Sequence, residues 1–162
     1  MKNRDESRAV GYDSPFGRGW IAYDEDGISE VTLPGASAPA PEAAGPPIGV
    51  VALADELAAY YASGPWPRHP ELVARAGSTP FGRRVYEMVA AIPSGQSRTY
   101  GDIARQLGRP RAARAVGRAM ATNPFPVIIP CHRVVGPDGS LKGFAGGVDM
   151  KAAMLEMEGA HG

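Results

Sequence analysis

Two proline-rich segments divide this chain and decide which parts of it can form regular structure. Residues 34–47 carry five prolines among small residues, and residues 64–70 carry three more. Proline lacks a backbone N–H and fixes φ, so neither a helix nor a central strand passes easily through such a segment. We therefore expect 34–47 to be an irregular loop and 64–78 to be a linker. The linker would separate an N-terminal lobe, 1–78, from a C-terminal domain, 79–162.

The N-terminal lobe has the pattern of β structure. Short β-type runs with turn residues between them predict strands at 8–12, 19–23 and 28–33. Asp26-Gly27 is a hairpin turn signal between the last two. Apolar residues at helical spacing predict one helix over 50–62. This part of the chain is therefore expected to be a small, β-rich lobe.

The C-terminal part is expected to be largely helical. Ser78 or Thr79 can cap a helix that begins at Pro80, and Thr99 can cap a second one. The expected helices after Pro80 cover 100–107, 111–122 and 148–158. A tight turn at 108–110 joins the first two of these, which is a helix-turn-helix pattern. The fold class predicted is mixed α and β (α+β), with a small β-rich N-terminal lobe and a helical C-terminal lobe.

Charge is distributed unevenly along the chain. The net charge is zero, but residues 79–162 hold 11 basic and 6 acidic side chains, and residues 1–78 hold 6 and 11. Between residues 98 and 118 six arginines face one aspartate. Such a run is often only a solvated face, but its position on a helical hairpin indicates a polyanionic partner.

The sole cysteine lies in a setting that suggests chemistry. Cys131 follows the apolar run 126–129, which we expect to be a short strand, and precedes His132 and Arg133. Neighbouring positive groups stabilise a thiolate, the nucleophilic form of cysteine. Consecutive residues of a strand point to opposite faces, so His132 reaches the thiol only if the chain turns or water bridges them. The alternative is that Cys131 is an inert, buried side chain.

Eight short motifs, in order across residues 79–159, resemble the O6-alkylguanine-DNA alkyltransferases, also called methylated-DNA–protein-cysteine methyltransferases. They are the segments at 79–81, 92–95, 99–101, 114–117, 123–124, 129–134, 146–147 with Lys151, and 158–159. Each motif alone is weak evidence for this family, but the combination of all eight in this order is specific to it. The resemblance implies a C-terminal domain with a winged-helix-like helix-turn-helix.

The resemblance assigns the chemistry to four residues. Cys131 matches the family's alkyl acceptor, and His132 matches the base that acts on it through a water molecule. Glu158 matches the carboxylate that orients the imidazole, and Asn123 would brace the active-site turn.

The resemblance also implies how the chain would hold DNA. Tyr100 would promote rotation of the damaged nucleotide out of the stack, and Arg114 would fill the space left in the duplex. The other DNA-binding residues expected are Ala113, Arg111 and Arg118.

The expected pocket for the flipped base departs from the family in two places. Its residues would be Met120, Pro126, Val134, Phe144 and Ala145. Phe144 stands where many relatives have tyrosine, and Ala145 where some have serine, so we expect methyl transfer with an altered substrate range. Some relatives bind zinc in the first lobe, but with the only cysteine committed to chemistry we predict no metal site and no cofactor.

The function predicted is stoichiometric transfer of an alkyl group from O6-alkylguanine in double-stranded DNA, by a monomer. The sequence leaves open whether O4-alkylthymine is also a substrate. One unpaired cysteine, a charged start and the lack of a long apolar run indicate the cytoplasm rather than a membrane or secretion. Three alternatives remain: an alkyltransferase-like protein that binds lesions without transfer, a cysteine hydrolase, and a helix-turn-helix regulator. Turnover would identify a hydrolase, and a regulator would be indifferent to Cys131.

Overall fold

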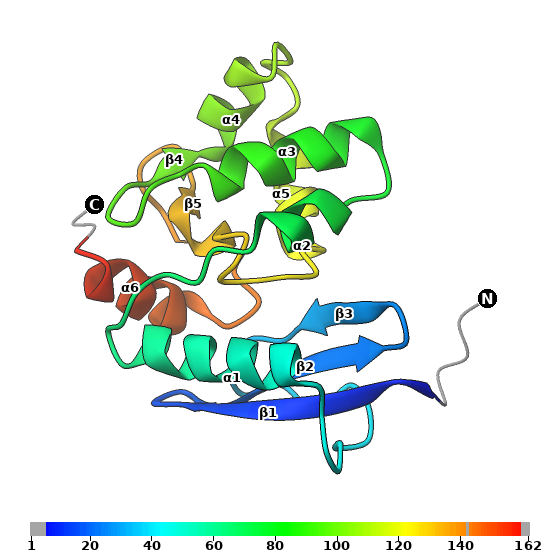
Figure 1. Cartoon of the computed structure of the whole chain (residues 1–162). Helices are drawn as coiled ribbons and strands as arrows, with labels where there is room; N and C mark the ends of the chain where they lie inside the picture. The colour runs from blue at the N-terminus through cyan, green and yellow to red at the C-terminus, as the bar shows by residue number, and fades with distance from the viewer. Residues whose placement is uncertain (1–5, 142, 160–162) are drawn as a thin grey trace. The chain divides into compact units, whose positions relative to one another are not determined.

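The computed structural model describes residues 6–141 and 143–159, and it divides into two compact units (Figure 1). The first unit ends at Pro67 and the second begins at Arg68. This division falls inside the segment 64–78 that the sequence predicted as a linker. Each unit has its own buried core.

The first unit is a three-stranded antiparallel sheet with one helix packed on it (Figure 1). Its elements are β1 (Arg8–Ser14), β2 (Gly17–Asp24), β3 (Gly27–Val31) and α1 (Ile48–Tyr61). β2 is the central strand, and α1 contacts β1 and β2. The three strands and the helix expected from the sequence are confirmed, with ends that differ by a few residues.

The proline-rich loop of the first unit is tied to the sheet at one point. Ala9 donates a backbone hydrogen bond to Pro41 and accepts one from Ala43, both at 2.9 Å. Glu42 thereby forms an isolated bridge with Ala9 at the edge of β1. The rest of 34–47 has no regular structure, as its composition predicted.

The second unit consists of five α-helices, one 3₁₀ turn and a two-stranded parallel ladder in the described part of the chain. Its elements are α2 (Pro70–Arg75), α3 (Pro80–Ala90), β4 (Arg98–Thr99), α4 (Tyr100–Gln106), α5 (Ala113–Ala121), η2 (Cys131–Arg133), β5 (Val134–Val135) and α6 (Val148–Met157). Helix α5 packs against α3 and α4, and α6 packs against η2. Helix α2, which lies within the expected linker, packs on α3.

Side-chain caps fix where α3 and α4 begin. Thr79 accepts a hydrogen bond from the N–H of Gly82 at 3.0 Å. Thr99 accepts one from the N–H of Asp102 at 2.9 Å, and the Asp102 carboxylate accepts one from the N–H of Thr99 at 3.0 Å. This reciprocal capping box places Tyr100 at the first position of α4. The predicted starts of both helices are confirmed.

The run 126–129 was expected to be a strand, and that prediction was wrong. Its contacts are local: Ile129 donates to the carbonyl of Phe125 at 2.8 Å, and Pro126 bridges to Ile129. Val127 has a φ of 75°, which a β-branched residue adopts only under strain. The apolar side chains are buried because a tight turn carries them into the core, rather than because they join a sheet.

Among the residues that the structure describes, none of the helices combines the length and the apolar character that crossing a membrane requires.

Candidate active site and DNA-binding surface

Cys131 begins the single 3₁₀ turn η2, so the chain does bend at the thiol. The N–H of Cys131 donates to the carbonyl of Ile129 at 2.7 Å, and the N–H of Arg133 donates to that of Pro130 at 2.9 Å. In a 3₁₀ turn consecutive side chains are about 120° apart instead of opposite. Cys131 is 8% exposed, whereas His132 and Arg133 are fully buried. Cys131 is therefore the one residue of the three with any exposed surface.

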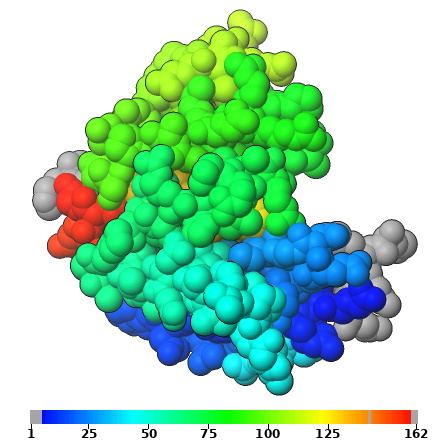
Figure 2. All heavy atoms as spheres, in the orientation of Figure 1, coloured from blue at the N-terminus to red at the C-terminus, as the bar shows by residue number. Residues whose placement is uncertain are grey.

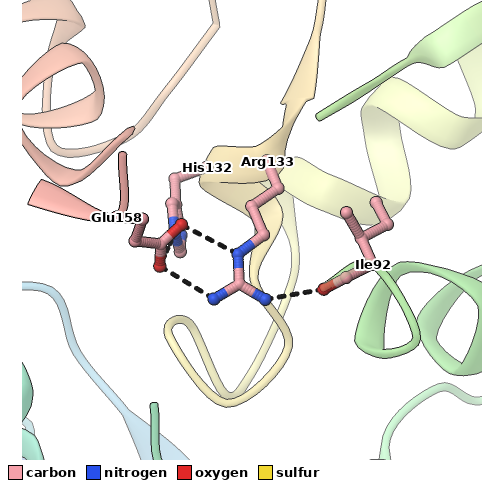
Figure 3. Close-up of polar contacts among 4 residues, drawn as sticks. All are labelled: Ile92, His132, Arg133 and Glu158. Carbon is pink, nitrogen blue, oxygen red and sulfur yellow. Dashed lines mark hydrogen bonds and ion pairs between the residues drawn. The ribbon is translucent and has the colours of Figure 1, made fainter. Parts of the chain in front are cut away.

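Glu158 joins His132 and Arg133 in one buried cluster (Figure 3). Its Oε2 lies 2.9 Å from His132 Nε2 and accepts a hydrogen bond from Arg133 Nη2 at 2.8 Å. Its Oε1 accepts a bond from Arg133 Nε at 2.9 Å, and Arg133 Nη1 donates to the carbonyl of Ile92 at 2.7 Å. A carboxylate with a 3% exposed side chain is thus compensated by a guanidinium and fixed in orientation.

The imidazole of His132 is arranged to be a neutral base. Burial lowers the pKa of His132 below its ordinary value, and the hydrogen bond and negative charge of Glu158 only partly oppose that effect. With Glu158 accepting from Nε2–H, the nitrogen with a basic lone pair is Nδ1. The cluster can therefore hold the imidazole in the tautomer that takes up a proton.

The Cys131 thiol is not ionised by its immediate sequence neighbours. Burial raises the pKa of Cys131, opposed by hydrogen bonding from Asn123 and by the positive charge of Lys151. Arg133, which the sequence suggested as a stabiliser of the thiolate, binds Glu158 instead. The site therefore combines a thiol whose pKa is raised with a neutral imidazole on the next residue of the chain.

Asn123 holds both ends of the turn before the thiol. Its Nδ2 donates to the carbonyl of Ile129 at 2.9 Å, and its Oδ1 accepts from the N–H of Phe125 at 2.9 Å. These two bonds close the turn in which Val127 has its strained backbone. The side chain thus positions the residues that lead directly into Cys131.

Two residues of the site were missed as functional candidates at the sequence level. Arg133 was read as a neighbour of the thiol rather than as the partner of Glu158. Lys151 was noted only as part of a motif, yet it is 1% exposed and donates to the carbonyl of Val134 at 2.6 Å. The sequence did contain one indication that Lys151 is buried, namely its spacing. It lies one helical turn after Gly147, on a helix whose Met150 and Met154 are also buried.

The residues expected to line the base pocket are divided between core and surface. Met120, Pro126 and Val134 are buried, Phe144 is half-buried and Ala145 is exposed. Lys151 Nζ lies 5.8 Å from the ring centre of Phe144, which places that ring beside the buried ammonium. The segment 143–147 therefore combines exposed backbone with one aromatic face close to the site.

Tyr100 and the arginines of the helix-turn-helix, formed by α4 and α5, are half-buried or exposed. Tyr100 is half-buried, and burial raises the pKa of its hydroxyl, with the negative charge of Cys131 adding to the rise. Arg111, Arg114 and Arg118 are exposed, and Ala113 is half-buried at the start of α5. The turn between α4 and α5 forms an outer tip of the second unit (Figure 2).

An open groove of about 730 Å³ runs along α5 on the side of Arg118. Its lining includes Arg75, Thr79, Phe81 and Thr122 as well as Arg118. Because Arg114 and Arg118 are four residues apart, they share a face of the helix. Positive charge therefore extends from the start of α5 to the edge of this groove.

Residues 80–160 match the family model for the DNA-binding domain of 6-O-methylguanine DNA methyltransferase. The methylated-DNA–protein-cysteine methyltransferase of Salmonella typhimurium is 50% identical over 107 residues, 66% of this chain and 62% of that protein. The protein of the same name from Mycobacterium tuberculosis is 47% identical over 104 residues, 64% of this chain and 62% of that protein. The matched segment thus covers less than two thirds of the length of these relatives.

Solved structures extend the likeness to nearly the whole chain. The crystal structure of Mycobacterium tuberculosis O6-methylguanine methyltransferase has a TM-score of 0.75 and 32% identity, and it covers 96% of this chain and 94% of that one. Mycobacterium tuberculosis OGT in complex with DNA has a TM-score of 0.73 and 33% identity, covering 94% and 92%. The mixed α and β fold class predicted from the sequence is confirmed.

Proposed function

Because the chain belongs to the methylated-DNA–protein-cysteine methyltransferase family, we propose that it repairs double-stranded DNA by moving an alkyl group from O6-alkylguanine to Cys131. The observation that carries the proposal is the arrangement of the thiol, His132 and Glu158. Cys131 as a residue keeps slight exposure, and a neutral imidazole held by a buried carboxylate follows it directly. This is what an acceptor needs if it is to stay protonated until a substrate arrives.

The proposed reaction is a displacement at the alkyl carbon. His132 takes the thiol proton through a water molecule, and the thiolate attacks the carbon in line with its bond to O6. The new sulfur–carbon bond forms as the oxygen–carbon bond breaks, and the electron pair of the broken bond remains on the guanine. The proton removed from the thiol finally replaces the alkyl group on the guanine, so the products are neutral guanine and an S-alkylcysteine.

The helical hairpin supplies the proposed DNA contacts. Arg111, Arg114 and Arg118 are exposed, and cationic side chains of this kind neutralise phosphates. We assign to Arg114 the space vacated by the flipped nucleotide and to Tyr100 the rotation of that nucleotide. Extrusion costs a few kcal/mol, and less for a damaged base whose pairing is already weak. Ala113 has no bulk that would keep the start of α5 away from the backbone of DNA.

The proposed transfer happens once per chain. A thioether has no acidic proton and is a poor leaving group, so water does not regenerate the thiol. Cys131 is the sole cysteine, so the chain holds no second thiol to accept the group. A sole cysteine forms no disulfide within the chain, and we propose that the protein acts as a monomer in the cytoplasm.

The principal alternative is a protein that binds the lesion and transfers nothing. It would need the acceptor thiol to be absent or inert, whereas here Cys131 is present beside a base. Phe144 and Ala145 are where such a loss of chemistry would first be sought. We propose that Phe144 keeps the stacking face of the pocket and that the backbone of the half-buried and exposed segment around it supplies the donors.

Intact-protein mass spectrometry tests the proposal. The protein is incubated with a duplex that carries one O6-methylguanine, beside the Cys131→Ser variant and an undamaged duplex. We expect a gain of one methyl group, found on the peptide that contains Cys131, and none in either control. Tight binding to the damaged duplex with no gain in mass would overturn the transfer and favour recognition alone.

A further inference from the structure

The groove of about 730 Å³ beside α5 includes none of the residues to which the transfer chemistry is assigned. Its walls come from the turn between α2 and α3, the first residues of α3, and α5 from Ala115 onward. All of these belong to the second unit. The groove therefore has room for a ligand, or part of a ligand, that is bound apart from the reacting base.

The polar groups of the groove are those that bind an anion. Arg75 and Arg118 contribute two guanidiniums, and no aspartate or glutamate lies among its wall residues. The hydroxyl oxygen of Thr79 accepts a hydrogen bond from the N–H of Gly82 at 3.0 Å, so its own proton remains to be donated. Guanidiniums and hydroxyls are donors that suit phosphate oxygens, and arginine can bind two of these oxygens at once.

Both guanidiniums of the groove are available to a ligand. Arg75 and Arg118 are exposed, and in the described part of the chain no ion pair includes either side chain. Arg109, in the turn before α5, is used differently, since its guanidinium lies 5.4 Å from the ring centre of Phe81. This contact holds one wall of the groove against the turn between α4 and α5. Arg75 and Arg118 are thus arginines that the rest of the second unit does not use.

Duplex DNA is the anion that the surroundings of the groove favour. Arg118 follows Arg114 by one turn of α5, on the same face and about 6 Å further along the helix axis. Each DNA strand carries a phosphate about every 3.4 Å along the duplex axis. A duplex that is held at Arg114 therefore brings further phosphates to the edge of the groove, where the charge is complementary to them.

We propose that the groove is a seat for a backbone phosphate of the DNA outside the lesion, bound by Arg75 from the end of α2 and by Arg118 from α5. The hydroxyl of Thr79 is its third donor. The contact is independent of base sequence, because phosphates carry none, and it fixes the register of the duplex on the protein. The occupant rests on the proposed function, since it is a further part of the same duplex, but the seat takes no part in the transfer.

The salt dependence of binding to an undamaged duplex tests the seat without alkyl transfer. Fluorescence anisotropy gives the affinity between about 50 and 200 mM KCl, and each neutralised phosphate contributes about 0.9 to the slope of log affinity against log salt. We expect the double variant Arg75→Gln, Arg118→Gln to have a slope that is shallower by about 0.9 or more. Arg84→Gln, which removes an exposed charge of α3 outside the groove, is the matched control and should keep the slope.

The single variants test whether both arginines bind the same phosphate. Arg75→Gln alone should weaken binding at low salt by about tenfold, and by clearly less when Arg118 is already glutamine. Both side chains are exposed, so the variants should fold, and thermal unfolding verifies this. An unchanged affinity and slope in Arg75→Gln would overturn the seat.

Neutral methylphosphonates locate the occupant. They replace single phosphates, one at a time, in a duplex that carries one O6-methylguanine, and Cys131→Ser binds the duplex without transfer. We expect one flanking position at which the replacement weakens binding to Cys131→Ser but not to Cys131→Ser with Arg75→Gln. If no position behaves in this way, the assignment to DNA is wrong and an acidic protein segment becomes the better occupant.

Failure of this inference and failure of the proposed function are distinguishable. A protein that gains no methyl group, but whose salt slope depends on Arg75 and Arg118, would overturn the proposed function and support the seat. A protein that takes up the methyl group, but has the same slope with glutamine at both positions, would do the reverse.

Discussion

Arg133 donates hydrogen bonds to both carboxylate oxygens of Glu158, from Nε to Oε1 at 2.9 Å and from Nη2 to Oε2 at 2.8 Å. Neither side chain is more than 3% exposed. The same Oε2 lies 2.9 Å from Nε2 of His132. The guanidinium thus determines where the carboxylate stands, and the carboxylate determines which way the imidazole faces. The carboxylate that pairs with the buried guanidinium therefore also sets the orientation of the imidazole.

Replacing Glu158 with Gln should damage both stability and reaction rate. Removing one partner of a buried ion pair leaves the other charge uncompensated, which costs about 3–5 kcal/mol of unfolding free energy. The imidazole would also lose the acceptor that fixes its tautomer, so we expect alkyl transfer to slow by about 10²-fold or more. Chemical denaturation and single-turnover transfer from a damaged duplex measure the two effects. Glu156→Gln, an exposed site on the same helix, is the control and should behave like the unmodified protein.

The buried imidazole should make the protein less stable in mild acid. The pKa of His132 is lowered in the folded state, chiefly by burial, while in the unfolded chain it is about 6.5. Below that pH the unfolded chain takes up a proton that the folded one does not. The free energy of unfolding should therefore fall as the pH drops from about 6.5 toward the folded pKa, and be fully present above 6.5.

Denaturation at several values between pH 5 and 8 checks this sign against His132→Gln. The remaining histidines, His69 and His161, are present in both proteins, so the difference between the two proteins isolates the effect of His132. The variant should show the smaller loss on acidification. A loss of equal size in both would mean that His132 does not titrate differently on folding.

Arg114→Ala should separate base flipping from chemistry. The exposed guanidinium lies on α5, away from the paired charges around Glu158, so its loss should slow transfer from duplex DNA about tenfold or more. Reaction with a free O6-alkylguanine base should change little, because no nucleotide has to be extruded. Arg84→Ala, at an exposed position on α3, controls for the loss of one positive charge. Equal slowing on both substrates would contradict the role given to Arg114.

Asn123→Ala should release the turn that precedes the thiol. The variant loses the bonds to Ile129 and Phe125, and we expect the unfolding free energy to fall by about 1–3 kcal/mol. The transfer rate should fall too, since the strained backbone at Val127 is no longer held from both ends. Thermal unfolding and single-turnover kinetics measure these effects. The neighbouring exposed Thr122→Ala should lie within about 0.5 kcal/mol of the unmodified protein.

Thr99→Ala should weaken α4 at the residue before Tyr100. Loss of the cap costs about 1 kcal/mol, and Thr99→Ser should restore it because the hydroxyl accepts the same bond. Frayed backbone at Tyr100 should slow transfer from duplex DNA in the alanine variant. If alanine and serine variants are equally slow, the cap is not what positions Tyr100.

The helices of the second unit could be predicted because residues adjacent in the sequence determine where they begin. Thr79 with Pro80, and Thr99 with Asp102, supply the start signals, and the structure uses both. Neighbouring residues fully determine such caps, so no tertiary information is needed. The cluster of Cys131, His132 and Glu158, by contrast, was expected through a family resemblance, since 26 residues separate the two members of its hydrogen bond.

The features that the sequence did not reveal depend on distant contacts. The β-branched run at 126–129 has strand propensity, but Asn123 bonds to it and closes a turn instead. Lysine is almost always exposed, so nothing local indicated that Lys151 would lie beneath Tyr100 and Phe144. Arg133 was assigned to the wrong partner because adjacency along the chain says little about where a long side chain ends.

The two-residue ladder of the second unit pairs Arg98 with Val134 and Thr99 with Val135 in parallel. It joins the start of α4 directly to the segment after the thiol, and the chain then turns at Gly136, which donates to Ser140. We expect the spacing between Tyr100 and Cys131 to be indifferent to the length of the exposed tip at 137–139. A fluorescent reporter could therefore be attached at that tip. If each protein molecule accepts one alkyl group, as proposed, such a reporter would give one signal for each transfer.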